Sequence, residues 1–408
     1  VFVLLLTAGF APSAVAQVCS VSPITLSSQA DVDGFQGTYG PCDTLTQNLT
    51  VSGGDITDLS GLSGITTAVI NVTIAISGNA ALTQLDGLSG LTNVHWLDIN
   101  NNAALANIDG LSNIVSASGP VIINGNASLT HVNGLSGLSA LPGGALFIEN
   151  NPSLNDISGV SGITSINASL VIGNNDLLVN LDALAGLTHV NSNIVISDNA
   201  ALTSISGLST MFDTFSETLY LQNNPSLASL QGLEGVSSIG GLNIFNNAAL
   251  TDLDPLSNLS SVGNGGLAVW HNSMLTSIDG LAGVEGVEWY FILSNNPSLS
   301  LCSVLETLLD EVDDFDPGPG PGPEGIPDIG GDVTVEVNAE GCNSIEEITG
   351  AAPPPEPPVE PPPPPPPPPP PTPTAGPVVP VPTLGWNALA LLALLTLGVG
   401  IAGLRRLS

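Results

Sequence analysis

Ten asparagines recur along the chain at intervals of 23 to 25 residues, and each is followed three residues later by a leucine. The residues five and three before each asparagine are apolar, and an aliphatic residue, usually preceded by glycine, stands nine after it. The asparagines are Asn79, Asn102, Asn126, Asn151, Asn175, Asn199, Asn224, Asn247, Asn272 and Asn296. Such a fixed period is typical of a solenoid, whose coils bury their apolar sides only against neighbouring coils.

Each repeat is expected to open with a short strand, because the apolar residues before the asparagine alternate, as Leu97 and Ile99 do. Residues 49–305 therefore predict an all-β-rich repeat solenoid, right-handed, with about eleven coils and a parallel β-sheet face. At about 4.8 Å per coil the rod would be roughly 50 Å long. The first coil has Gly53 where asparagine is expected, and we interpret it as an end coil without a further neighbour.

The asparagine column has two interpretations, a structural ladder or a row of ligands for a metal. A carboxamide both donates and accepts hydrogen bonds, so it can satisfy the backbone groups that are exposed where each strand turns. We therefore predict a structural ladder.

The two ends of the chain look like caps and targeting segments. Residues 1–16 resemble a signal peptide that is truncated at its start, and residues 17–48 and 306–350 are predicted to cap the solenoid. Four cysteines fall in these flanks as Cys19 with Cys42 and Cys302 with Cys342. Two capping disulfides fit this placement and imply an oxidising compartment. Each would contribute roughly 3–4 kcal/mol on the chain-entropy argument.

The charge balance excludes several classes of partner. All basic charge lies in Arg405 and Arg406, and 36 acidic residues leave a net charge of −34. Nothing on the repeats could displace counterions from phosphates, which argues against nucleic acid and anionic membrane surfaces as partners. The acidic surface is interpreted as an aid to solubility, with cation binding as the alternative.

The C-terminal segment combines a spacer, a short motif and a membrane stretch. Residues 351–380 are proline-rich and predict an extended spacer. Residues 388–404 are apolar enough for a transmembrane helix whose flanking arginines face the cytoplasm. The motif residues are Val381, Pro382, Thr383, Leu384, Trp386, Arg405 and Arg406. Residues 381–408 resemble the IPTL-type sorting signal of Gram-negative bacteria, although Val381 replaces isoleucine and Asn387 replaces glycine. The resemblance implies an exosortase-like sorting protease and delivery to the bacterial cell surface or outer envelope, and an ordinary single-pass anchor is the alternative.

The repeat itself resembles the leucine-rich-repeat family, in particular the receptor L-domain type of surface receptors and wall proteins. The resemblance covers residues 49–305. It implies extracellular recognition or adhesion, in which a protein or glycan binds to the face of the sheet.

Aromatic residues point to a binding surface on that face. Phe245 and Trp270 both stand two residues before their ladder asparagine in consecutive coils, so the two rings should stack. The candidate binding residues are Trp96, Phe147, Tyr220, Phe245, Trp270, His271, Trp289 and Tyr290. Tryptophan and tyrosine offer large contact areas with a polar tip, which suits protein and sugar ligands. The alternative interpretation is that aromatic residues simply favour strands.

Catalytic chemistry is not indicated. The four histidines lie in separate coils without a partner at fixed spacing, and no phosphate-binding, dinucleotide or zinc motif is present. The acidic run 310–316 lacks the ligand pattern of a calcium loop. We therefore expect a binding protein with no enzyme activity, cofactor or metal. The alternatives are a self-associating surface or matrix protein and, further off, a polysaccharide-active β-helix enzyme.

Overall fold

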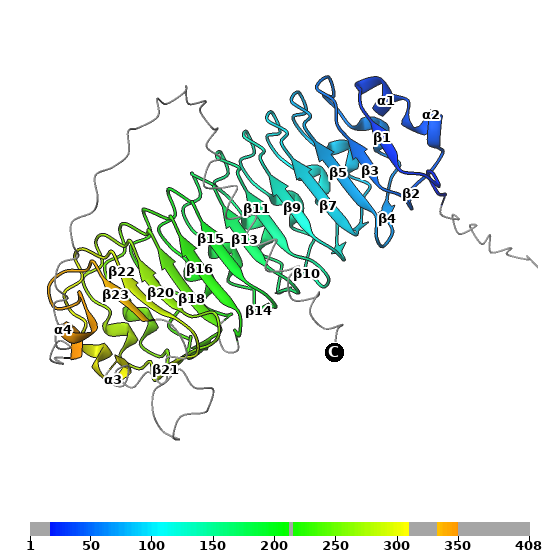
Figure 1. The fold of residues 1–408 in the computed structure, drawn as a ribbon. Helices are drawn as coiled ribbons and strands as arrows, with labels where there is room; N and C mark the ends of the chain where they lie inside the picture. The colour runs from blue at the N-terminus through cyan, green and yellow to red at the C-terminus, as the bar shows by residue number, and fades with distance from the viewer. Residues whose placement is uncertain (1–16, 212–214, 310–332, 350–408) are drawn as a thin grey trace, which may run out of the picture. The chain divides into compact units, whose positions relative to one another are not determined.

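The repeats build one continuous parallel sheet (Figure 1). The computed structural model of the protein describes residues 17–211, 215–309 and 333–349, and within them this main sheet has 13 strands in chain order. The strands are β1 (Ile24–Leu26), β3 (Leu49–Val51), β5 (Thr73–Ser77), β7 (Trp96–Asn100), β9 (Val121–Asn124), β11 (Leu146–Glu149), β13 (Leu170–Gly173), β15 (Ile194–Ser197), β16 (Thr218–Gln222), β18 (Gly241–Phe245), β20 (Leu267–Trp270), β22 (Phe291–Ser294) and β23 (Val333–Glu336). Eleven of them, β3 to β22, lie in residues 49–305, as the coil count predicts.

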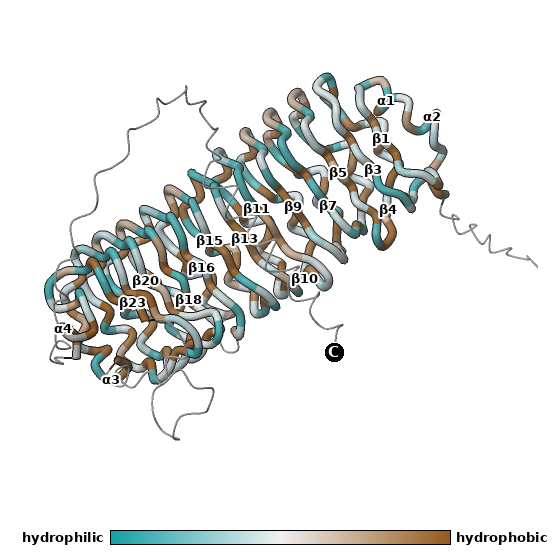
Figure 2. The backbone as a smooth tube through the Cα atoms, viewed as in Figure 1, coloured by the Kyte–Doolittle hydropathy of each residue, from teal (hydrophilic) through white to brown (hydrophobic). Residues whose placement is uncertain are grey.

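The strands alternate as the apolar pattern predicts. On β7, Leu97 and Ile99 are completely buried, whereas Trp96 is exposed and Asp98 is half-buried. Leu97 pairs with Ile74 on one side and with Val121 on the other, so equivalent residues of successive coils form straight columns. Figure 2 shows the apolar residues recurring from coil to coil along the body. The buried columns form a single continuous core.

In most coils the return half contains a 3₁₀ turn and a short strand. The turns are η1 (Ser60–Leu62), η2 (Asp86–Leu88), η3 (Asp109–Leu111), η4 (Asn133–Leu135), η5 (Ser158–Val160), η6 (Asp182–Leu184), η7 (Ser206–Leu208), η9 (Asp254–Leu256), η10 (Asp279–Leu281) and η11 (Ser303–Leu305). Three small parallel sheets follow them. They contain β2 (Thr44–Leu45), β4 (Thr67–Ala68), β6 (Asn93–Val94) and β8 (Ser116–Ala117); β10 (Ala140–Leu141), β12 (Ser165–Ile166) and β14 (His189–Val190); and β17 (Ser238–Ile239), β19 (Ser261–Val262) and β21 (Gly286–Val287).

The glycine ahead of the aliphatic residue lets the 3₁₀ turns of neighbouring coils approach closely. A Cβ atom at Gly134 would lie 1.8 Å from the carbonyl oxygen of Ile108 in the preceding coil, much closer than two unbonded atoms tolerate. The same position holds Ala183 in η6 and Pro255 in η9. Val304 occupies it in η11, so glycine is the usual residue at this position but is not present in every coil.

The ten repeat asparagines form the predicted ladder and are completely buried. Asn102 is typical: its Nδ2 donates to the backbone oxygen of Ile76 at 2.9 Å and to Oδ1 of Asn126 at 3.1 Å. Its backbone nitrogen also donates to Oδ1 of Asn126, at 3.2 Å. Each carboxamide therefore satisfies a carbonyl of the coil before it and accepts from that coil's backbone, which confirms the structural interpretation.

The residue just before each ladder asparagine adopts a left-handed backbone. Such residues include Asn101 with φ 55° and Asn174 with φ 54°. Asparagine and glycine tolerate this region best, which explains why pairs of asparagines recur in the sequence.

The N-terminal cap adds a strand to the sheet, so the interpretation of the first repeat as an end coil is wrong. Strand β1 pairs with β3, with Ile24 opposite Leu49. Two short helices, α1 (Gln29–Asp33) and α2 (Phe35–Tyr39), then bury Val32 and Phe35. The cap closes the core because its own apolar residues cover the first repeat.

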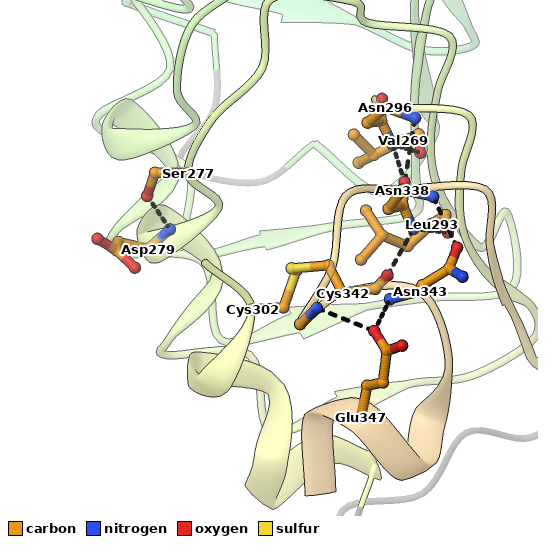
Figure 3. Close-up of a disulfide and its surroundings, with 11 residues drawn as sticks. Val269, Ser277, Asp279, Leu293, Asn296, Cys302, Asn338, Cys342, Asn343 and Glu347 are labelled. Carbon is orange, nitrogen blue, oxygen red and sulfur yellow. Dashed lines mark hydrogen bonds between the residues drawn. A yellow bond between two sulfur atoms is a disulfide. The ribbon is translucent and has the colours of Figure 1, made fainter. Parts of the chain in front are cut away.

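The C-terminal cap extends both the sheet and the ladder (Figure 3). Strand β23 pairs with β22, and Asn338 stands in the ladder position: its Oδ1 accepts from the backbone nitrogen of Asn296 at 3.0 Å, and its Nδ2 donates to the oxygen of Leu293 at 2.8 Å. The cap also contains α3 (Glu306–Leu309) and α4 (Ile345–Thr349). The predicted disulfides are confirmed: Cys302 bonds Cys342 in this cap, and Cys19 bonds Cys42 in the other.

Several predictions fall outside the described residues. They are the signal peptide 1–16, the acidic run 310–316, the proline-rich spacer 351–380 and the sorting and transmembrane segment 381–408. Within 17–211, 215–309 and 333–349, the structure contains no helix with the length and hydropathy needed to span a bilayer.

Candidate binding surface on the strand face

The outward side chains of the main sheet form three parallel columns, which together we call the strand face. They stand six, four and two residues before each ladder asparagine. On β18 these positions are Gly241, Asn243 and Phe245, and the register aligns the last two with Ala268 and Trp270 on β20. Because the register holds from strand to strand, each column can be read directly from the sequence.

The predicted aromatic stack is present between β18 and β20. The rings of Phe245 and Trp270 lie 4.2 Å apart between centroids, with 24° between their planes. His271 contacts both rings, with centroid distances of 5.7 Å to Phe245 and 5.3 Å to Trp270. Phe245 and Trp270 are half-buried and His271 is exposed, so the cluster presents aromatic surface to solvent.

His271 takes the left-handed position that asparagine, aspartate or glycine occupies in the neighbouring coils. Its φ is 56°, against 54° for Asn246 and 55° for Asn295 in the coils on either side. Histidine tolerates this region better than most residues do. The substitution therefore keeps the coil geometry and adds an imidazole beside the aromatic stack.

Tyr290 lies flat over a glycine of the neighbouring coil. A Cβ atom at Gly266 would be 2.7 Å from the Tyr290 ring, so only glycine leaves room for the ring there. The hydroxyl of Tyr290 donates to Oδ1 of Asn243 on β18 at 3.3 Å. Tyr290 thus reaches from the coil of β22 past β20 to β18 and brings together residues 47 positions apart.

Asn243 is the polar group at the centre of this arrangement. Its side chain is 8% exposed, and its Nδ2 has no hydrogen-bond partner in the part of the chain that the structure describes. On β16, Tyr220 is its register neighbour. Burial raises the pKa of the Tyr220 hydroxyl, and the nearby Tyr290 raises it further, while a hydrogen bond with Thr218 opposes the shift. The Tyr220 hydroxyl therefore stays neutral across the physiological range.

We call six of these residues the aromatic patch: Tyr220, Asn243, Phe245, Trp270, His271 and Tyr290. The other candidates lie around it or away from it. Trp289 flanks the patch, 56% exposed, with its ring centroid 5.5 Å from that of Tyr290. Phe147 belongs to an apolar column that runs through Val171 and Val195 to Tyr220. Trp96, 38% exposed, stands on β7, six strands from β18 in the sheet order.

Sequence reasoning missed Asn243 and Gly266. Asn243 interrupts a column whose other members from β9 to β22 are Ile122, Phe147, Val171, Val195, Tyr220, Ala268 and Ile292. That break in an apolar column was a readable signal. Gly266, by contrast, becomes informative only once Tyr290 is seen to lie over it.

No lysine or arginine lies on the strand face, since the chain has no lysine and both arginines lie outside the described residues. Burial raises the pKa of the Glu149 carboxyl on β11. Among the described residues, no group of three or more histidine, cysteine or acidic side chains is placed to hold a metal ion. What the patch offers is aromatic surface with neutral hydrogen-bonding groups.

Comparisons with known proteins give only distant likenesses. No family model matches the chain, and no curated protein matches it. One similar solved structure is an internalin, InlF, from Listeria monocytogenes, with 19% identity and a TM-score of 0.35 over 57% of this chain and 70% of that one. Another is the complex of TLR13 with ssRNA13, with 14% identity and a TM-score of 0.23 over 68% of this chain and 55% of that one. Likenesses this distant carry no argument about partners.

The chain's own geometry defines its architecture. A leucine frame, parallel coils and a buried asparagine ladder make it a leucine-rich-repeat-like solenoid.

Proposed function

We propose that the protein is an extracellular recognition or adhesion protein that binds a protein or glycan through the strand face, and that it is not an enzyme. The observation that carries the proposal is the aromatic patch. The Phe245 and Trp270 rings stack at 4.2 Å with His271 against them, and Tyr290 and Asn243 lie alongside.

The physical case rests on what such a cluster supplies to a partner. Aromatic side chains have few rotatable bonds, so they lose little conformational entropy on binding, and they bury large areas. Residues of this type therefore dominate the binding energy at interfaces. Rigid strands hold these rings in place, and strands position a site more accurately than loops do. The patch therefore offers a preorganised anchor.

Two further features support an extracellular location. The two disulfides bracket the solenoid, and structural disulfides persist in oxidising compartments. The C-terminal segment resembles a bacterial sorting signal, and we propose that it delivers the chain to the cell surface through an exosortase-like protease. Mass spectrometry of the mature protein, with and without that protease, tests this part of the proposal.

The binding proposal is tested by capture from isolated surface proteins and glycans, with the full chain held in a detergent that has no sugar headgroup. The test variant changes Phe245, Trp270 and Tyr290 to alanine. The control is Val115→Ala, which changes an exposed apolar side chain in the return half of a coil, outside the strand face. We expect an identified ligand to bind the wild type and the control, and to lose at least about tenfold in affinity for the triple variant. Circular dichroism of all three proteins checks that they are folded.

The competing outcomes are distinct. If the ligand binds the triple variant as tightly as the wild type, the aromatic patch is not the binding surface. If the wild type captures only further copies of itself, the strand face serves self-association, and the recognition proposal fails.

A further inference from the structure

A buried hydrogen-bond donor without a partner is unusual in a folded protein, because burying such a group unpaired destabilises the fold. The Nδ2 of Asn243 is such a donor among the described residues. Its column is otherwise mostly aliphatic, so valine or alanine would fit the strand without this cost. The bond from the Tyr290 hydroxyl uses only Oδ1, so the fold gives no role to Nδ2.

The groups around Asn243 suit one kind of ligand. The Phe245 and Trp270 stack is half-buried, so it leaves an apolar aromatic surface open beside the carboxamide. The Tyr290 hydroxyl and the Asn243 amide add neutral donors and acceptors next to that surface. A pyranose ring has one face of C–H groups and a rim of hydroxyls, which matches an aromatic surface bordered by an amide and phenols.

Charge decides which sugars fit. Neither arginine lies in the described residues, and the whole chain has a net charge of −34. An anionic sugar such as a uronate would meet no lysine or arginine at the patch and would be repelled by the chain as a whole. The ligand consistent with these surroundings is a neutral one.

Tyr290 is placed to act as a cover. Its ring rests on Gly266, which has no side chain. Its hydroxyl bonds Asn243 at 3.3 Å, longer than the range of about 2.5–3.0 Å that is usual for O–H···O bonds. Because Nδ2 is buried, a ligand hydroxyl reaches it only when this ring turns aside. A sugar hydroxyl that replaces the tyrosine hydroxyl can then bond both polar atoms of the carboxamide.

We propose that the aromatic patch binds a neutral pyranose unit of a glycan, which stacks on Phe245 and Trp270 and bonds the Asn243 carboxamide through its hydroxyls. This proposal rests on the proposed function, because it identifies the ligand class of the same surface.

The test is an array of neutral hexose, N-acetylhexosamine and pentose oligosaccharides, together with anionic oligogalacturonates, probed with the full chain in a detergent without a sugar headgroup. Titration calorimetry then measures the tightest glycan against Trp270→Ala, Asn243→Val and the control Val115→Ala, which changes an exposed apolar side chain outside the strand face. We expect a neutral glycan to bind, no oligogalacturonate to bind, and both patch variants to weaken binding at least tenfold. The control should bind as the wild type does.

Asn243→Val separates a ligand role from a structural one. If the Asn243 side chain stabilised the fold, its replacement would lower the Tm. We expect instead that the Tm of this variant is unchanged or higher, while its affinity for the glycan falls. A lower Tm with unchanged affinity would overturn the proposal.

The array also separates this inference from the broader one. Suppose that no neutral glycan binds, but the wild type captures a surface protein that the triple variant does not bind. The sugar proposal then fails and the recognition proposal stands. If neither binds, both fail.

Discussion

At several positions of the coil, the residue type is set by the backbone conformation or by the side-chain hydrogen bonds that the position requires. Asparagine recurs at two adjacent positions of the coil for different reasons: Asn174 adopts a left-handed backbone, with φ 54°, and Asn175 contributes its buried carboxamide to the ladder. Where the residue type differs from that of the equivalent position in other coils, as at His271 and Asn243, the side chain contributes to the aromatic patch. Departures from the repeat are therefore the best guide to function.

Glu149 gives a pH-dependent prediction at the same scale. Burial raises the pKa of its carboxyl above the ordinary value of 4.5, so between the unfolded and folded pKa the native state binds more protons than the unfolded state. Stability contributed by this group is then present below pH 4.5 and is lost as the pH rises through the folded pKa. We expect Glu149→Gln to have a higher Tm than the wild type at pH 7.5.

Thermal melts of both proteins from pH 3.5 to 8 check this expectation. The difference between their Tm values isolates Glu149 from the other carboxylates. It should shrink as the pH falls through the folded pKa and level off below pH 4.5. A difference that grows as the pH falls would contradict it.

At the scale of the element, each coil depends on its neighbour for hydrogen bonds that its own strand cannot supply. Asn175 donates to the oxygen of Ile148 at 2.9 Å and accepts from the backbone nitrogen of Asn151 at 3.3 Å. The glycine in the 3₁₀ turn meets the same need for close stacking on the return side, where Gly134 lies against Ile108. The coil is thus a unit of packing and does not stand alone.

We expect Asn175→Ala to destabilise the protein by about 2–4 kcal/mol, because it leaves a buried carbonyl and a buried N–H without partners, at about 1–3 kcal/mol each. The control is Asn174→Gly, which keeps the left-handed backbone and should cost less than about 1 kcal/mol. Urea unfolding followed by circular dichroism measures both variants. Equal losses for the two changes would mean that the ladder bonds contribute little.

At the scale of the whole molecule, the caps and the charge decide whether the stacked coils persist. The repeats supply a continuous core, and strands β1 and β23 of the two caps close its ends. The net charge of −34 destabilises the folded state, because like charges repel more strongly in the folded chain than in the expanded one.

Added salt should therefore stabilise the protein. The Debye length falls from about 30 Å at 0.01 M to about 10 Å at 0.1 M salt, which screens most of the long-range repulsion. We expect the Tm to rise by a few degrees between 10 and 500 mM NaCl at pH 7.5, as measured by calorimetry. Affinity for a neutral glycan should change less than about twofold across the same series. A Tm that falls with salt would show that attractive charge pairs dominate.

The sequence by itself determined the strands, their register, the coil count, the ladder and the pairing of Phe245 with Trp270, because a fixed repeat places equivalent residues in columns. It did not reveal that Asn338 continues the ladder, although Val333 and Val335 precede it in the repeat frame, since 42 residues separate it from Asn296. Nor did it reveal the cap strand β1. Only the tertiary structure decided that Tyr290 lies over Gly266 and reaches Asn243. The physical reason is that register fixes where each Cβ points, whereas the space left by neighbouring side chains decides where a long side chain ends.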